Sequence, residues 1–180
     1  MTSALLVIDV QESFRQRKNW AEVSNPGVAV EVGRLVDAAR EKGDVVIWVL
    51  HSEPGSDTPF DPESGHVRLV DGLAPRDGEP VLTKTSRNAF TTTNLQQRLT
   101  ELGVRKVVVC GIQTEQCCET TARLAADLGY EVDFVTEATA TFPIRWDDRV
   151  LGTDDIIERT EFALAGRFAT IRTVKELTEA

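Results

Sequence analysis

Short apolar, β-branched runs alternate with amphipathic segments along this chain, and that alternation constrains the fold more than any other feature. Runs of this kind occupy residues 4–10, 45–50 and 104–109. A continuous apolar run of this length, bounded by turn signals, is typical of a parallel strand covered on both faces. Because segments with helical spacing lie between the runs, we predict a doubly wound α/β fold.

The complete pattern predicts a three-layer α/β sheet of about six parallel strands with helices on both faces, in a single domain over residues 1–180. Further strands are predicted at residues 81–83, 131–135 and 168–171, and helices at residues 26–42, 94–102, 118–128 and 153–164, with a short helix at the end. Residues 51–80 are predicted to form a long loop, with a short extra strand at 67–70, and residues 136–148 form a second loop. A loop as long as 51–80 is usually functional, often as a lid or pocket wall.

Composition excludes several functions. A net charge of −9 argues against nucleic acid as a partner, because a phosphate backbone requires a basic face. No apolar run is long enough for a membrane span, and the first residues lack the pattern of a signal peptide. The three cysteines, two of them adjacent, do not form a disulfide framework, so we expect a reducing cytoplasm.

Cys117 is a candidate nucleophile. It follows the strand that ends at Gly111 and falls near the first turn of the next helix. The positive end of a helix dipole favours a thiolate at such a position. The alternative is that Cys117 is a small core residue, as free cysteines usually are.

Asp9 and Lys84 follow two other predicted strands. Both residues could have purely structural roles. Asp9 could cap the end of its strand, and Lys84 could be a surface charge or form an ion pair with Asp9. If the strand at 4–10 and the strand at 104–109 flank the topological switch point, Asp9 and Cys117 face one crevice. Asp9 would then be the base for the thiol, and Lys84 would orient Asp9 and favour the anionic forms.

Four motifs in this order resemble the isochorismatase-like cysteine hydrolases, which include nicotinamidases and N-carbamoylsarcosine amidases. The resemblance covers nearly the whole chain. It is carried by the residues Leu6-Val7-Ile8-Asp9-Val10-Gln11-Glu12-Ser13-Phe14, by Gly78-Glu79-Pro80-Val81 with Lys84 and Asn88-Ala89-Phe90, by Gly111-Ile112-Gln113-Thr114-Glu115-Gln116-Cys117 with Thr120-Thr121-Ala122, and by Glu137-Ala138-Thr139-Ala140.

The resemblance implies a catalytic triad of Asp9, Lys84 and Cys117, with Cys117 as nucleophile and Cys118 facing the core. It also implies a cis peptide bond between Ile112 and Gln113. The backbone amides of Gln113 and Cys117 would form the oxyanion hole. The implied reaction is hydrolysis of a small amide, imide or lactam through a thioester.

Metal binding is where this chain departs from part of the family. Nicotinamidases carry an Asp-x-His pair after the second strand and a later histidine, which bind a metal. The matching residues here are His51, Ser52 and Glu53, with His66 further on. We therefore expect no metal and no other cofactor, although His51, Glu53 and His66 could in principle form a metal site.

Substrate-binding residues are expected on the loops at the carboxyl edge of the sheet. The candidates besides Gln113 are Phe14, Trp20, His51, Glu53, Phe142, Arg145 and Trp146. Phe142 and Trp146 could instead close neighbouring loops, and Arg145 could pair with surface acids. Glu53, Glu115 and the acidic surface would be compatible with a cationic substrate.

Other functions remain open on the sequence. The first alternative is hydrolysis of an isochorismate-type vinyl ether, and the second is a catalytically silent binding domain on the same fold. A nucleotide-binding protein is disfavoured, because no GxGxxG or Walker pattern follows any strand. The expected partner is a small-molecule amide, with neither nucleic acid nor membrane, and the resemblance implies a homodimer or homotetramer.

Overall fold

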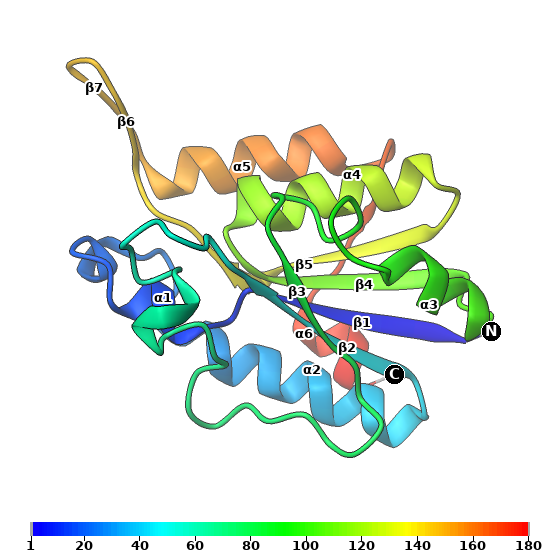
Figure 1. The fold of residues 1–180 in the computed structure, drawn as a ribbon. Helices are drawn as coiled ribbons and strands as arrows, with labels where there is room; N and C mark the ends of the chain where they lie inside the picture. Colours follow the sequence, from blue (N-terminus) through cyan, green and yellow to red (C-terminus); the bar gives the residue numbers. More distant parts are fainter. Residues whose placement is uncertain (1, 180) are drawn as a thin grey trace.

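Six parallel strands form the central sheet, in the order β3-β2-β1-β4-β5-β8, in a computed structural model that describes residues 2–179 (Figure 1). The strands are β1 (Ser3–Ile8), β2 (Val45–His51), β3 (Val81–Lys84), β4 (Lys106–Ile112), β5 (Glu131–Ala140) and β8 (Thr170–Ile171). The α/β prediction is confirmed. The order reverses between β1 and β4, which makes their carboxyl ends the topological switch point.

Helices cover both faces of the sheet (Figure 1). One face carries α2 (Val28–Lys42) and α6 (Val174–Thr178), and the other carries α3 (Leu95–Glu101), α4 (Glu119–Asp127) and α5 (Thr153–Leu164). Successive residues of β1 point to opposite faces, so Leu6 packs in the core with α3 and α4, whereas Leu5 and Val7 pack with α2. The continuous apolar run at residues 4–8 is therefore buried on both sides.

Several predicted boundaries are wrong. β5 continues to Ala140, into the loop expected at 136–148. The end of that loop and the residues up to 151 form a hairpin of β6 (Ile144–Trp146) and β7 (Arg149–Leu151) that projects from the body (Figure 1). The strand expected at 67–70 is only an isolated bridge between Gln11 and Leu69. Helix α2 begins at Val28 rather than at residue 26, because the Asn25 side chain accepts from the amide of Gly27 and forms a turn there.

Two of the remaining helical segments lie near the carboxyl edge and one lies in the long loop. They are α1 (Glu12–Arg15), the 3-10 turn η1 (Trp20–Glu22) and the 3-10 turn η2 (Pro62–Ser64). Among residues 2–179, no helix combines the length and apolar character that crossing a bilayer requires.

Glu79 ties the end of the long loop to the sheet and to α2. Its carboxylate accepts hydrogen bonds from Arg40 Nε at 2.7 Å, from Trp48 Nε1 at 2.8 Å and from the backbone amide of Arg76 at 2.9 Å. Despite partial burial, these contacts lower the pKa of Glu79 from its usual 4.5 to about 2.

Replacing Glu79 with glutamine is expected to lower the free energy of unfolding at pH 7 by on the order of 2 kcal/mol. Because the folded-state pKa is depressed, the stabilisation is complete above pH 4.5 and is lost as the pH falls toward 2. Denaturant unfolding of both proteins should show their difference narrowing over that range. Glu41→Gln is the control, since Glu41 is exposed on α2 and forms no ion pair in the described chain. An unchanged difference down to pH 2 would contradict the assignment.

Candidate active site

Four functional side chains lie in a row along the carboxyl edge of the sheet because their strands are neighbours. Lys84 is the last residue of β3 and pairs in register with His51, the last residue of β2. Asp9 directly follows β1, and its amide donates to Val49 O in β2 at 2.8 Å. Cys117 lies in the π-helical turn η3 (Thr114–Cys118), which follows β4.

Gly111 permits the close approach of β4 to the end of β1. It pairs with Ile8 in the parallel ladder and has a φ of +128°. A side chain there would place Cβ 1.9 Å from the carbonyl oxygen of Ile8, so only glycine fits. The cis peptide bond implied between Ile112 and Gln113 is present directly after it.

Lys84 joins the base and the candidate nucleophile. Its Nζ lies 2.7 Å from Asp9 Oδ2 and donates to Cys117 Sγ at 3.4 Å. Lys84 and Asp9 are both completely buried. The contact between them is an ion pair, and neither carboxylate oxygen of Asp9 accepts a hydrogen bond of regular geometry from the described residues. Asp9 therefore retains lone pairs that can take a proton.

The thiol of Cys117 is held in its protonated form. Burial, with a smaller contribution from the Asp9 carboxylate, raises its pKa from 9.0 to about 12, against the opposing effect of Lys84. Burial also raises the pKa of Asp9, against the effect of Lys84. Lys84 thus favours the thiolate, as expected, but desolvation outweighs its effect, so the resting form is the thiol. A nucleophile in this setting needs a base at the moment of attack.

Alkylation tests this protonation state. With a thiol pKa of about 12, the rate at which iodoacetamide labels Cys117 is expected to keep rising above about pH 9, where an ordinary cysteine levels off. Peptide mapping by mass spectrometry would follow the label. Cys118, which is completely buried, should stay unlabelled in the folded protein and serves as the internal control. A plateau near or below pH 8.5 would show instead that Lys84 and the helix dipole dominate.

His51 is neutral and extends the row of polar groups outward. Burial and the charge of Lys84 lower its pKa. Its Nδ1 lies 3.2 Å from Lys84 Nζ, and its Nε2 lies 3.1 Å from Glu53 Oε1. With the proton on Nε2, Nδ1 accepts from Lys84 and Nε2 donates to Glu53, and Arg87 Nη1, 2.9 Å from Nε2, then cannot donate to that nitrogen.

These contacts do not suit a metal ion. His51 Nδ1 faces the ammonium of Lys84, and Nε2 lies 2.9 Å from a guanidinium nitrogen of Arg87. A cation at either nitrogen would meet these positive charges. His66 lines a different cavity from His51. Across residues 2–179, no three His, Cys, Asp or Glu side chains gather as a metal site would require.

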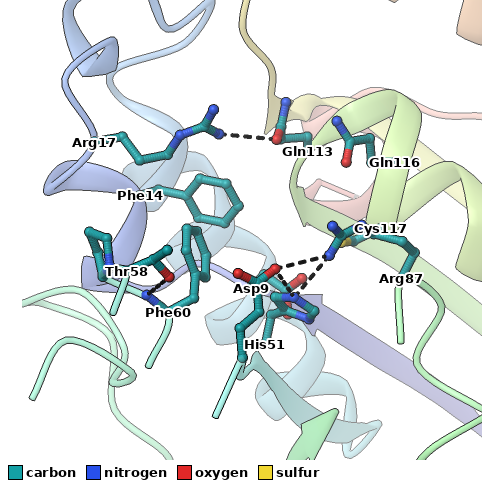
Figure 2. Close-up of a pocket in the computed structure, with 12 residues that line it drawn as sticks. Asp9, Phe14, Arg17, His51, Thr58, Phe60, Arg87, Gln113, Gln116 and Cys117 are labelled. Carbon is teal, nitrogen blue, oxygen red and sulfur yellow. Dashed lines mark hydrogen bonds and ion pairs between the residues drawn. The ribbon is translucent and has the colours of Figure 1, made fainter. Parts of the chain in front are cut away.

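A cavity of about 440 Å³, large enough for a small molecule, opens over this centre (Figure 2). Six residues singled out from the sequence line it: Asp9, Phe14, His51, Glu53, Gln113 and Cys117. Lys84 lies behind them in the protein interior. The oxyanion role of the Gln113 and Cys117 amides stays a prediction, and their position at the cavity is compatible with it.

Four of the expected pocket residues do not reach this cavity. Phe142 is buried beneath Phe14, with ring centroids 6.1 Å apart, and Trp20 packs on the far side of Phe142. Arg145 forms an ion pair with Glu22. Trp146 is 68% exposed on the β6–β7 hairpin.

The sequence reasoning missed six other residues that line the cavity: Arg17, Thr58, Pro59, Phe60, Arg87 and Gln116. Arg17 lies after α1, and Thr58 to Phe60 belong to the long loop that was expected to form a pocket wall. Gln116 could have been found as the residue directly before Cys117. Arg87 adjoins the motif at residues 88–90 but gave no chemical signal of its own.

Buried Gln11 was also missed as a structural link at this edge. Its Oε1 accepts from the amide of His51 at 2.7 Å, and its Nε2 donates to His51 O at 2.9 Å. The side chain thus joins the segment after β1 to the end of β2, which holds Asp9 and His51 beside each other.

Comparison with known proteins gives one consistent match. Residues 3–160 match the isochorismatase domain. The chain is 31% identical to YrdC, an uncharacterized isochorismatase family protein of Bacillus subtilis, over 97% of this chain and 93% of that protein. It is 32% identical to nicotinamidase 3 of Arabidopsis thaliana, over 78% of this chain and 74% of that protein.

The similarity extends to solved structures. The crystal structure of an isochorismatase from Pseudomonas putida superimposes with a TM-score of 0.88 at 32% identity, covering 97% of this chain and 89% of that one. The six-stranded sheet and its covering helices are therefore shared with that protein.

Proposed function

The chain belongs to the isochorismatase family of hydrolases, and we propose that it cleaves the C–N bond of a small amide, imide or lactam with Cys117 as nucleophile and without a metal. One observation carries the proposal: Lys84 Nζ contacts both Asp9 and Cys117 at a buried centre that opens onto a cavity. This supplies a base, a cation and a nucleophile together. The similarity to a nicotinamidase supports amide chemistry.

Acylation begins with proton transfer, because the thiol is protonated at rest. Asp9 takes the proton from Cys117 Sγ as the sulfur attacks the carbonyl carbon of the substrate. Lys84, already beside Sγ, stabilises the negative charge as it forms. The charge then passes to the carbonyl oxygen, where the backbone amides of Gln113 and Cys117 are proposed to bind it.

Collapse of the tetrahedral intermediate breaks the C–N bond. The protonated Asp9 returns its proton to the leaving nitrogen, which departs as ammonia or an amine from an open-chain amide and stays tethered to the acyl group in a lactam or cyclic imide, and a thioester remains on Cys117. Asp9, again a carboxylate, takes a proton from water, and the resulting hydroxide attacks the thioester. The C–S bond breaks, Asp9 gives its proton to the departing Cys117 sulfur, and the carboxylic acid is released, which regenerates the thiol and the Asp9 carboxylate.

A screen of small amides tests the function directly. Release of ammonia or amine is measured for each compound, and intact-protein mass spectrometry after a rapid acid quench detects the acyl group, which peptide mapping should assign to Cys117. Metal-free buffer with a chelator should leave the rate unchanged. Turnover of an isochorismate-type vinyl ether without any acyl-enzyme would favour the alternative reaction, and ligand binding without turnover would favour a silent binding domain.

We also propose a homodimer or homotetramer in a reducing cytoplasm. Apolar side chains on the projecting hairpin, Trp146 and Val150 among them, are exposed, as is Phe162 on α5. Light scattering is expected to give a mass of two or four chains, and Trp146→Asp is expected to shift it toward the 19.9 kDa of one chain. A monomer at all concentrations would contradict the assembly. The three cysteines are free, which supports a reducing compartment, and cell fractionation would test this.

A further inference from the structure

Arg17 is a half-buried cation in the wall of the cavity that forms no ion pair with any described residue. The other cations at this site are compensated. Lys84 pairs with Asp9 at 2.7 Å, and Arg87 lies 3.5 Å from Glu53. With His51 neutral, the site therefore carries one excess positive charge, and that charge belongs to Arg17. This is unusual in a chain whose net charge is −9.

The guanidinium of Arg17 is held in place by its surroundings. It lies 4.8 Å from the centroid of the Phe142 ring and 5.9 Å from that of Phe14. One of its nitrogens donates to Gln113 Oε1 at 3.3 Å, a neutral acceptor. Figure 2 shows the guanidinium at one end of the cavity, pointing toward Gln113 above the ring of Phe14, with Asp9 and Cys117 beyond that ring.

Burial lowers the pKa of Arg17 and Glu53 raises it, but a guanidinium remains charged under any ordinary condition. It is therefore a partly desolvated charge with one hydrogen bond to protein and up to four donors left for a ligand. A planar carboxylate is the group that a guanidinium binds with two parallel hydrogen bonds.

No acidic side chain of the described protein pairs with Arg17. Glu53 also lines the cavity, but its Oε1 is contacted by His51 and Arg87, and it forms no ion pair with Arg17. Glu115 accepts from Thr141 Oγ1 and from Gln113 Nε2. Glu115 does not line the cavity, so of the two acids expected to favour a cationic substrate only Glu53 lies there, and that expectation stays a prediction.

We propose that Arg17 binds a carboxylate of the substrate, so that the enzyme acts on a small amide that also carries a carboxylate. This rests on the proposed amide hydrolysis at Cys117. The amide lies against Cys117 and Asp9 while the carboxylate reaches Arg17, and the chain between them lies beside Phe14 and Phe60, whose rings meet edge to face at 4.9 Å. Arg17 is a specificity-determining residue in this arrangement and takes no part in bond breaking.

Three amides with the same two-methylene chain differ in their terminal group. Succinamate ends in a carboxylate, butyramide in a methyl group and β-alaninamide in an ammonium group. The wild-type protein is expected to favour succinamate, or its homologue glutaramate, over the matching neutral amide by on the order of 100-fold in kcat/KM, with the ammonium compound last. Equal rates for the three compounds overturn the proposal.

Variants then assign the preference to Arg17. Arg17→Gln should lower kcat/KM for the carboxylate amide by on the order of 100-fold and leave that for butyramide within a few-fold. Arg17→Lys should recover part of the loss, because it keeps the charge without the planar fork. Arg15→Gln is the matched control: Arg15 lies on α1, pairs with Glu12 at 3.8 Å and does not line the cavity, so its activity should be unchanged. Equal losses on succinamate and butyramide in a folded Arg17→Gln protein overturn the proposal.

Binding to the Cys117→Ala protein separates this proposal from the proposed function. Calorimetric titration with succinamate and glutaramate should show binding that is lost in the Cys117→Ala, Arg17→Gln double variant and retained in the Cys117→Ala, Arg15→Gln one. Carboxylate-dependent binding of this kind without hydrolysis by the wild type would reject the amidase function and keep the anion site. Hydrolysis of amides at rates that do not depend on a carboxylate would reject the anion site and keep the amidase function. Failure of both carboxylate probes to bind or react overturns the anion site.

Discussion

Replacing Cys117 with alanine is expected to lower amide hydrolysis by at least about 1,000-fold while the protein stays folded. Sγ is the atom that forms the thioester in the proposed reaction, and neither of the other two cysteines lines the cavity, since Cys118 and Cys110 are completely buried. Ammonia release with the best substrate from the screen measures the loss. No acyl-enzyme mass should be detected in the variant.

Cys118→Ala is the matched control for this substitution. It removes a thiol from the adjacent position, but Cys118 packs in the core with Ala122 and Ala125 on α4. We expect a modest loss of stability from the small cavity that it leaves, with kcat/KM within a few-fold of wild type. Substantial turnover by pure, folded Cys117→Ala protein, or loss of turnover only in Cys118→Ala, would move the nucleophile elsewhere.

Replacing Asp9 with asparagine is expected to lower kcat by about 1,000-fold or more, because an amide cannot take the proton of a thiol whose pKa is about 12. The substitution also leaves the buried ammonium of Lys84 without its counter-charge. We therefore expect a loss of stability on the order of 3 kcal/mol, measured by denaturant unfolding. In the wild type, kcat should fall at acid pH as Asp9 becomes protonated, with a midpoint above pH 3.8 because burial raises the pKa of Asp9. The residual kcat of the Asp9→Asn protein should not show this fall.

Asp133 provides a control because, like Asp9, it is a buried aspartate that pairs with a lysine, but it does not line the cavity. It is buried on β5 and pairs with Lys106 at 2.7 Å, and neither residue lines the active-site cavity. Asp133→Asn should thus destabilise the protein comparably and leave kcat/KM unchanged when assayed below its unfolding transition. Equal losses of activity in the two variants would mean that Asp9 acts only through stability.

Most of the fold could be predicted from the sequence. Residues 4–8, 45–50 and 107–109 are apolar at every position, and a strand buried on both faces satisfies that pattern in a doubly wound sheet. Gly43, Gly103 and Gly129 adopt positive φ where the helices between the strands end. Local patterns of this kind act over a few residues, so one sequence is sufficient to recognise them.

The hairpin and the extension of β5 could not be predicted in the same way. Residues 136–140 continue β5 because they pair with β4 beyond a register shift between Val109 and Gly111. Polar threonines and a glutamate in that segment gave no strand signal. The strands β6 and β7 pair with each other outside the core, and all six of their residues are exposed, so no hydrophobic alternation marks them.

Part of the candidate site could likewise be predicted from the sequence, and part could not. Asp9, Lys84 and the Cys117 turn could be placed together from the sequence, because each follows a strand of one parallel sheet and such positions meet at one edge. The loop residues that enclose the cavity, the missing ion pair of Arg17 and the protonated state of Cys117 could be found in the folded structure alone. These properties depend on desolvation and on contacts between segments far apart in the chain, and neither has a local pattern in the sequence.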